Sequence, residues 1–385
     1  MVRQVSLDVI QASLIANEVD GRQARVYVRH LLEQSASAQN LPNSEYQIDP
    51  RDGTVSIYSS ARSKRVHTVK TSTVAADDGD NCPICNGQLT GVCHIEPLSQ
   101  GHCFITENLY PVVHPRGMFV PISQNFSTTE TADEAARGGN IFGGHFLQWT
   151  SSIHTQDWHN MSLDDLTLSV KQLALFSLRI HTESESMPQA LGTRENTHGY
   201  MSIFKNYGEK GGASLTHGHQ QIVFSNLMGR SSYNNWRFYG RHCEYFSDYM
   251  LRENSQDLKI KDYGDIVLMV PYFMHRPYTM LVIVKQTQKG YLHQLSDDEV
   301  TQFTQAIQHA IRAVRHELAA DGKPIAFNFL LHTGPGCGLY AEIIPRADTF
   351  GGLELQGTYV CQAQPEDCAL RIKKTIANDF SEEVF

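Results

Sequence analysis

The pattern of hydrophobic and polar positions predicts two long helices, each lying between short apolar strands. The first helix begins after Ser162, a residue type that caps helix N-termini, and Asp165 follows three residues later. An apolar strand is expected at 144–149 before this helix, and another around 202–204 after it. The buried stripe of the helix is expected to consist of Leu166, Val170, Leu173 and Ile180.

The second helix repeats this arrangement. Ser296 and Glu299 have the spacing of a capping box, and Gly322 is expected to end the helix. Its stripe is expected to consist of Val300, Phe303, Ile307, Ile311, Val314 and Leu318. The accompanying strands are expected at 278–284, 327–332 and 343–345. We therefore predict an α+β fold in which a strand–helix–strand unit occurs twice, with the chemistry in the first copy.

The remaining segments are predicted to be peripheral. An amphipathic helix is expected at 5–15 and a second near 24–28, whereas 71–80 is expected to be a loop and 122–140 a polar insertion. The resulting division is a peripheral segment 1–50, a first half 51–230 and a second, degenerate half 231–385.

Composition limits the classes of function. The chain has 385 residues, of which 41% are hydrophobic and 19% charged, as in a globular protein with a large core. The formal charge of −9 argues against non-specific binding of nucleic acid, although a local patch would suffice for a small phosphorylated molecule. The apolar runs are too short for a membrane span, and residues 1–4 lead into no secretory signal, so we expect a cytoplasmic protein.

The strongest candidate for chemistry is the sequence T-H-G-H-Q-Q at 216–221, followed by apolar residues. Side chains alternate along an extended segment, so His217, His219 and Gln221 are expected to converge on one side. Glycines lie just upstream, where the backbone could approach a phosphate closely. These glycines are Gly208, Gly211 and Gly212.

A second candidate is the C-x-x-C pair of Cys82 and Cys85, whose spacing lets both thiolates reach one tetrahedral zinc. Eight cysteines in a long chain of this kind favour metal ligation or free thiols over a disulfide framework. The spacing alone leaves the other ligands open, and a pair of reduced thiols without metal is the alternative. The candidates for the remaining ligands are Cys93, Cys103, His154 and His217.

Several motifs occur in an order that resembles a known family. R-S-K-R at 62–65 precedes the C-x-x-C pair, and F-K-N-Y-G at 204–208 precedes S-L-T-H-G-H-Q-Q at 214–221. They are similar to the R-x-K-R, C-x-x-C and F-x-N-x-G … S-x-x-H-P-H-x-Q motifs of the galactose-1-phosphate uridylyltransferase branch of the histidine-triad (HIT) superfamily. The resemblance runs from about residue 49 to residue 372. It implies duplicated HIT-like units that form antiparallel sheets flanked by helices.

The resemblance also implies roles for individual residues. His219 would be the nucleophile and Gln221 its catalytic partner. The implied zinc ligands are Cys82, Cys85, His154 and His217. His159 lies five residues after His154 and is the alternative to it as the third ligand. The implied substrate-binding residues, which would contact phosphates, ribose or base, are Arg62, Arg65, Glu107, Asn108, Asn206 and Ser214.

The chain also departs from the family. Gly218 replaces the usual proline between the two histidines, and 340–342 is Y-A-E where many relatives have H-x-H. The second metal of some relatives is therefore not expected here, despite His332. The family's sugar contacts are not recognisable around 353–357, which leaves the acceptor open.

Three functions compete. The first is transfer of a nucleoside monophosphate from a nucleoside diphosphate-sugar to a sugar 1-phosphate through a covalent nucleotidyl-histidine. The second is the same chemistry with inorganic phosphate as acceptor, a phosphorylase. The third is a zinc-stabilised nucleotide-binding protein without turnover, which the presence of both His219 and Gln221 disfavours. Neither nucleic acid nor membrane is an expected partner, and a homodimer is compatible with all three.

Overall fold

The computed structural model describes residues 3–16, 45–48, 55–58, 79–89, 91–113, 138–141, 143–184 and 199–379. The helix predicted near 24–28 and the two arginines of the R-S-K-R motif lie outside these ranges. The loop prediction for 71–80 concerns described residues only at 79 and 80, which form a bend and a turn.

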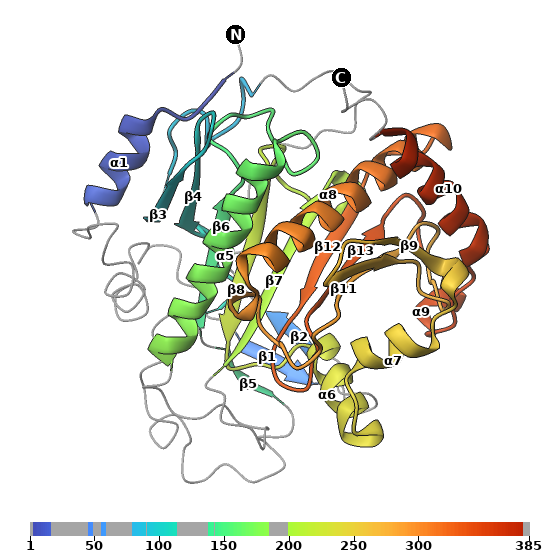
Figure 1. Ribbon diagram of the computed structural model, residues 1–385. Coiled ribbons are helices and arrows are strands. Elements are labelled where there is room, and N and C mark those ends of the chain that lie inside the picture. The colour runs from blue at the N-terminus through green and yellow to red at the C-terminus, as the bar shows by residue number, and fades with distance from the viewer. Residues whose placement is uncertain are drawn as a thin grey trace, which may run out of the picture.

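A ten-stranded sheet forms the centre of the molecule, and every pairing between neighbouring strands is antiparallel (Figure 1). In spatial order the strands are β3 (Val92–Pro97), β4 (His102–Glu107), β6 (Gly143–Trp149), β8 (His219–Ser225), β7 (Tyr200–Tyr207), β12 (Phe327–His332), β13 (Tyr340–Pro345), β11 (Met280–Val284), β10 (Ile266–Met269) and β9 (Lys259–Asp262).

The order of the central strands reveals the duplication. The sequence β6-β8-β7 is mirrored by β12-β13-β11, and the two sets meet where β7 pairs with β12. One long helix follows β6 and another follows β11, as the repeated pattern predicts. The α+β fold of duplicated strand–helix–strand units is thus confirmed, and the two units share one continuous sheet.

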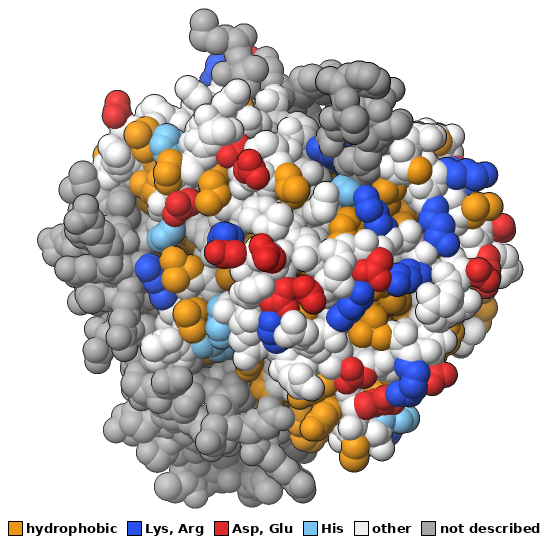
Figure 2. Space-filling view, in the orientation of Figure 1, with side chains coloured by type: hydrophobic (Ala, Val, Ile, Leu, Met, Phe, Trp, Pro, Cys, Tyr) orange, Lys and Arg blue, Asp and Glu red, His pale blue; other side chains and the backbone are white. Residues whose placement is uncertain are grey.

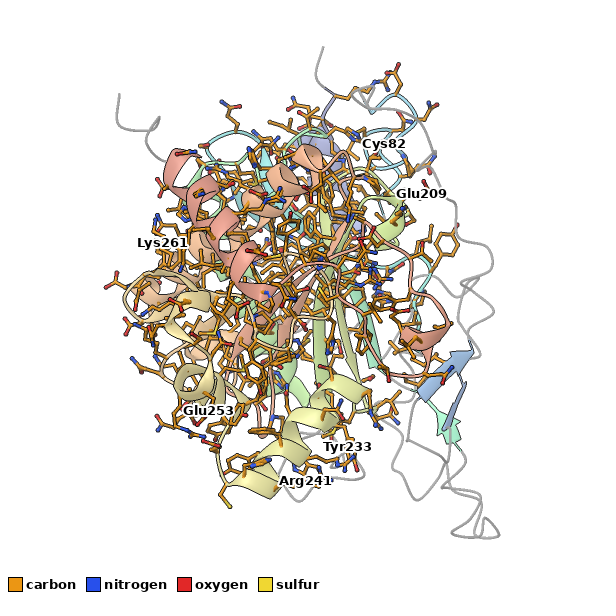
Figure 3. The ribbon with its side chains drawn as sticks, turned by 90° about the vertical axis from the view of Figure 1, so that its right-hand side faces the viewer. Cys82, Glu209, Tyr233, Arg241, Glu253 and Lys261 are labelled. Atoms are coloured by element: carbon orange, nitrogen blue, oxygen red, sulfur yellow. The ribbon has the colours of Figure 1, made fainter. Side chains whose placement is uncertain are left out.

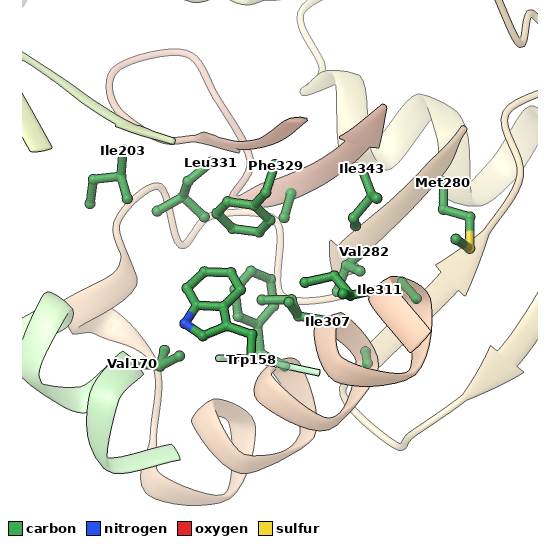
Figure 4. Packing of buried hydrophobic residues seen from close by; sticks show 14 of the residues in the cluster. Trp158, Val170, Ile203, Met280, Val282, Ile307, Ile311, Phe329, Leu331 and Ile343 are labelled. Atoms are coloured by element: carbon green, nitrogen blue, oxygen red, sulfur yellow. The ribbon is translucent and has the colours of Figure 1, made fainter. Parts of the chain in front are cut away.

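Helices α5 (Leu163–Ser184) and α8 (Asp297–Ala320) lie side by side across one face of this sheet (Figure 1). All the apolar stripe positions predicted for both helices are buried. They pack on strand residues such as Ile203, Phe329 and Ile343 in one core that spans both units (Figure 4). Burial of these stripes supplies most of the driving force that fixes the helices on the sheet.

The helix caps differ in detail from each other. In α8 the Ser296 hydroxyl accepts from the Glu299 backbone N–H and the Glu299 carboxylate accepts from Ser296 N, a reciprocal capping box. In α5 the Ser162 hydroxyl caps Asp165 N at 3.2 Å. The Asp165 carboxylate instead accepts from the backbone and hydroxyl of Ser99, so the start of α5 is tied to the turn between β3 and β4.

The predicted N-terminal helix is present as α1 (Leu7–Ala16). Within 122–140, the part that the structure describes is not an insertion loop but strand β5 (Gly138–Asn140). It pairs with β1 (Glu45–Ile48), which also pairs with β2 (Val55–Tyr58), in a small separate sheet. The other helices within the described residues are α6 (Arg230–His242), α7 (Phe246–Glu253), α9 (Gly352–Leu355) and α10 (Pro365–Asp379), with 3-10 turns η5 (Glu209–Gly211), η6 (Gln256–Leu258) and η7 (Leu292–Gln294).

The face covered by α5 and α8 carries charged side chains of both signs in a mixed distribution (Figure 2). Its apolar side chains form small groups between them. Among the helices that the structure describes, none has both the length and the apolar character needed to cross a membrane.

Candidate active site and metal centre

Four side chains that can ligate a metal converge beside the beginning of β8. The ligand atoms of Cys82, Cys85, His154 and His217 all lie within 4.8 Å of one another. The Cys85 Sγ is 3.4 Å from His154 Nδ1 and 3.5 Å from His217 Nδ1. The Cys82 Sγ is 3.8 Å from His217 Nδ1.

These distances fit a tetrahedral zinc ion. Zinc binds sulfur at about 2.3 Å and imidazole nitrogen at about 2.0–2.1 Å, which places adjacent S and N ligands roughly 3.5 Å apart. The pKa of the Cys82 thiol is lowered, chiefly by its hydrogen bond with Cys85, which favours the thiolate that a metal requires. The donor set of two thiols and two imidazoles is that of a structural site with no open position.

Both histidines present Nδ1 to the centre because their other ring nitrogens are engaged. His217 Nε2 lies 2.7 Å from the carbonyl oxygen of Ser151, and His154 Nε2 lies 3.4 Å from the Thr216 hydroxyl. Donation from Nε2–H to the Ser151 carbonyl leaves the Nδ1 lone pair of His217 for a metal. Such outer contacts set the orientation and tautomer of ligating imidazoles.

The N-terminal segment closes over the C-x-x-C knuckle. Val5 N donates to Ser152 O at 2.9 Å, and His154 N donates to Arg3 O at 3.0 Å. The Arg3 guanidinium forms a 2.6 Å ion pair with Asp80. Gly79, at φ 82°, packs so closely on the His154 ring that an added Cβ would lie 2.8 Å from its Cγ. The segment therefore holds the knuckle and the third ligand together.

The other candidate ligands lie elsewhere. Cys93 and Cys103 are fully buried, and their thiols approach Ile105 O and the Gln172 amide oxygen. The His159 ring packs edge-on against Tyr207 at 5.9 Å. The structure thus brings Cys82, Cys85, His154 and His217 together, whereas the His159 ring lies against Tyr207.

His219 is the first residue of β8, whereas His217 lies in the turn before it. His219 Nδ1 is 2.8 Å from the carbonyl oxygen of His217, so Nδ1 carries the proton and Nε2 carries the lone pair. Burial lowers the pKa of His219 to about 4, which keeps the imidazole neutral. Its ring and that of His217 both pack on Trp149, at 5.1 Å and 5.5 Å. The two histidines therefore share one face of the sheet, opposite α5.

Gln221, two residues further along β8, is buried and bonded to a residue that the sequence analysis did not single out. The Gln221 amide oxygen is 3.2 Å from Nε2 of His145 on β6. In the tautomer in which His145 Nδ1 accepts from Val112 N at 3.2 Å, the ring proton is on Nε2 and can be donated to the Gln221 oxygen. With its oxygen occupied in this way, the Gln221 NH₂ group is left to donate elsewhere.

The upstream glycines form the turn between β7 and β8. Gly208, at φ 74°, has no room for a side chain, since a Cβ would lie 2.6 Å from Ile325 O. Asn206 precedes this turn, and its amide oxygen accepts from Asn328 of the second unit at 2.8 Å. Ser214 follows the turn and is buried. Glu209 of this turn and Cys82 lie toward the same end of the molecule in Figure 3, away from α6.

Of the remaining residues predicted to contact substrate, the structure describes Glu107 and Asn108. Glu107 ends β4, and burial raises its pKa to about 7. Asn108 follows it, and its backbone N–H donates to His145 O at 2.9 Å. Its amide nitrogen lies 3.0 Å from His145 Nε2 and competes with the Gln221 oxygen for that ring nitrogen. Arg62 and Arg65 lie outside the described residues.

Sequence reasoning missed three residues at this site: His145, Asp157 and Lys205. Each occurs where the pattern predicts structure, not chemistry: His145 and Lys205 within strands, and Asp157 in the segment before α5. A polar residue inside an otherwise apolar strand was the available signal. Neither spacing nor motif indicates what such a residue contacts across the sheet.

The fold defines a structural class. The chain, with its mirrored ten-stranded sheet, has the fold of solved uridylyltransferase-like structures. This agrees with the fold that the resemblance of its motifs to the galactose-1-phosphate uridylyltransferase branch implies.

Comparison with known proteins identifies specific relatives. No family model matches the chain. The chain is 23% identical over 358 residues to ADP-glucose phosphorylase of Arabidopsis thaliana, covering 84% of this chain and 91% of that protein. A solved uridylyltransferase superposes with a TM-score of 0.64 at 18% identity, over 87% of this chain and 99% of the other. The crystal structure of an Arabidopsis thaliana ADP-glucose phosphorylase with bound ADP-glucose gives 0.58 at 18% identity, over 86% and 98%.

Proposed function

We propose that this protein is a nucleotidyltransferase that moves a nucleoside monophosphate from a nucleoside diphosphate-sugar to a phosphate-bearing acceptor. The transfer would proceed through a covalent nucleotidyl-histidine on His219. The observation that carries the proposal is the 2.8 Å contact between His219 Nδ1 and His217 O, which directs the nucleophilic Nε2 lone pair away from the backbone.

The reaction comprises two substitutions at phosphorus. In the first, His219 Nε2 forms a bond to the α-phosphorus while the bond to the bridging oxygen breaks, and sugar 1-phosphate leaves with that oxygen. In the second, a phosphate oxygen of the acceptor attacks the same phosphorus and the P–N bond breaks, which restores neutral His219.

Gln221 suits transfer better than hydrolysis. Its amide NH₂ can donate to a non-bridging phosphate oxygen, but it has no proton that it can exchange with water in this pH range. The His145 contact at 3.2 Å keeps the amide oxygen turned away from the phosphate. The intermediate would therefore persist until an acceptor arrives. Arg62 and Arg65 keep their proposed role as forked contacts that neutralise the phosphates.

Zinc is the proposed occupant of the Cys82, Cys85, His154 and His217 cluster. Bound there, it would supply structural support by joining the C-x-x-C knuckle to the turn before β8. The chain's own contribution is the placement of His217, whose carbonyl oxygen positions the ring of His219.

Two acceptors are proposed. The first is a sugar 1-phosphate, as in a uridylyltransferase. The second is inorganic phosphate, and the match of 84% of the chain to an ADP-glucose phosphorylase favours it. The face that binds phosphates is the same in both cases, so the difference lies in the part of the site that holds the acceptor's sugar.

The test is to trap the intermediate. Purified protein is incubated with a panel of nucleoside diphosphate-sugars, beginning with ADP-glucose and UDP-sugars, without acceptor. We expect one nucleotidyl group per chain, acid-labile as phosphoramidates are, on the peptide that contains His219, with stoichiometric release of sugar 1-phosphate. Initial rates with acceptor should follow ping-pong kinetics. Adduct formation that survives in His219→Ala would refute the assignment.

The acceptor is identified in the same experiment. The labelled protein is divided and given inorganic phosphate or a hexose 1-phosphate, and the nucleotide product is identified by mass. A nucleoside diphosphate product indicates a phosphorylase, and a nucleoside diphosphate-sugar indicates a sugar-1-phosphate transferase. Nucleotide binding without any adduct would support the non-catalytic alternative.

A further inference from the structure

A buried ion pair lies directly behind the proposed nucleophile. Lys205 Nζ and Asp157 Oδ1 are 2.8 Å apart, and these residues are only 1% and 6% exposed. Lys205 is on β7 and faces α5, on the side of the sheet opposite the His219 ring. Asp157 is in the segment between β6 and α5.

The pair reaches His219 through the backbone. Lys205 Nζ is 3.3 Å from the carbonyl oxygen of His219. The last registered pair of β7 and β8 is Phe204 with Gln221, so this carbonyl lies beyond the regular ladder between those strands. A buried carbonyl requires a donor, and here Lys205 supplies it in place of a neighbouring strand.

Asp157 holds the other side of the same segment. Its carboxylate accepts from the Thr150 hydroxyl at 3.2 Å and from Trp158 N at 2.8 Å. Thr150 N in turn donates to Gly218 O at 2.9 Å. A Cβ on Gly218 would lie 2.7 Å from Asp157 Cγ, so the carboxylate fits only because residue 218 has no side chain.

Stability alone does not explain this arrangement. Removing two charges from water is costly, and replacing a buried ion pair with neutral groups of similar size is often neutral or stabilising. Although burial opposes ionisation, the charge of Lys205 lowers the pKa of Asp157 below its usual value. Asp157 likewise offsets part of the decrease that burial causes in the pKa of Lys205.

We propose that Asp157 and Lys205 are positioning residues that fix the backbone of residues 217–219, and that glycine at 218 is required to admit them. With this backbone fixed, the His217 carbonyl stays aligned with His219 Nδ1 and the Nε2 lone pair points consistently toward the α-phosphorus. The inference rests on the proposed function, and its test includes a measurement that needs no turnover.

The test compares two matched double variants. Asp157→Asn/Lys205→Met removes the charges and the bond to the His219 carbonyl but retains the shape of residue 157. Lys289→Met/Glu299→Gln removes an ion pair of the second unit, at 2.5 Å, in which the Glu299 side chain is 2% and the Lys289 side chain 23% exposed, and glutamine preserves the helix cap. Metal content, donor affinity and single-turnover adduct formation are measured for each.

We expect both variants to retain metal and donor affinity, while adduct formation slows about 10–100-fold in the Asp157/Lys205 variant only, since small misplacements of a reacting group have effects of this size. A native rate would overturn the proposal, as would equal losses in the two variants.

Gly218→Ala leaves both charges in place and should also slow the adduct step. It keeps the proposal testable if the double variant does not fold, and a native rate in Gly218→Ala would equally overturn it.

The measurement without turnover is the tautomer of His219. In protein labelled with ¹⁵N in its histidine rings, long-range ¹H–¹⁵N spectra report which ring nitrogen carries the proton, and His219→Gln assigns the signal. We expect a single Nδ1–H tautomer in the native protein and a mixture in the Asp157/Lys205 variant. An unchanged tautomer in the variant refutes the positioning role even if the native protein forms no adduct. Absence of an adduct in the native protein, with the tautomer shift present, refutes the proposed function alone.

Discussion

His145 illustrates how a residue outside any motif can determine what a motif residue does. Gln221 can place either its oxygen or its NH₂ group toward a phosphate, and only the NH₂ group is attractive there. We propose that a proton on His145 Nε2, 3.2 Å from the Gln221 oxygen, selects the orientation that turns the NH₂ group toward the phosphate. The same ring accepts from Val112 N, so the segment that follows the proposed nucleotide contacts is fixed by the same side chain.

This arrangement makes a prediction about His145→Phe. Phenylalanine fills a similar volume but cannot bond the Gln221 oxygen, so the amide should sample both orientations. We expect the single-turnover rate of adduct formation to fall about 5–20-fold. The reason is that the charge-assisted hydrogen bond from the Gln221 NH₂ group to the phosphate, worth roughly 1–2 kcal/mol, is lost part of the time. The measurement is rapid-quench trapping of the adduct at saturating donor.

A double-mutant cycle provides the control. In the background of Gln221→Met, which has no amide to orient, His145→Phe should have little further effect on the rate. Additive losses from the two substitutions would show that His145 acts through the 108–112 segment or through stability, and not through Gln221.

At the scale of elements, the sequence pattern predicted those features that depend on a single segment of the chain. The two helices, their serine caps and their buried stripes follow from spacing within one segment, and the C-x-x-C pair needs only its own turn to present both thiols. The hydrogen-bond partner of the Asp165 carboxylate could not be predicted correctly, because that partner, Ser99, lies in a different part of the chain. The contacts of His145 and Lys205 depend in the same way on the register between strands, which no single segment encodes.

The proposed metal ligands come from elements that are distant in the sequence: the knuckle at 82–85, His154 before α5 and His217 before β8. We predict one equivalent of zinc by native mass spectrometry and its loss in Cys82→Ser. Because the metal couples these three segments, its loss should lower the Tm by roughly 5–10 °C, which corresponds to a few kcal/mol in a domain of this size.

Cys243→Ser is the matched control, since Cys243 is exposed and lies outside the cluster. It should bind one zinc and unfold at the native temperature. A Cys82→Ser protein that contains no metal and has the native Tm would contradict the structural role. Zinc retained by Cys82→Ser would contradict the ligand assignment.

At the scale of the whole molecule, the repeated pattern predicted two units but not how they cooperate. The helices of the two units pack on one sheet, and the second unit also contacts the segment that carries Asp157. The Gln308 amide of α8 donates to the carbonyl oxygens of Trp158 and Met161, at 3.0 Å in both cases, and Arg312 donates to His159 O at 2.9 Å. The Trp158 ring packs edge-on against Phe329 of β12 at 5.0 Å (Figure 4). The unit without the motif therefore holds a loop of the unit that contains it.

Gln308→Ala tests whether this support matters for catalysis. Two buried carbonyls lose their donor, which should decrease the free energy of unfolding by about 1–3 kcal/mol. The loop at 157–161 should also relax, so adduct formation on His219 should slow several-fold although residue 308 is remote from the phosphate.

Gln302→Ala is the control. Gln302 is also on α8, but its amide oxygen accepts from Asp265 N at 2.7 Å, beside the second unit's own strands. Chemical denaturation and single-turnover trapping are measured for both. A comparable loss of stability with a slower rate only in Gln308→Ala would show that the second unit positions the nucleophile, whereas equal rates would limit its role to folding.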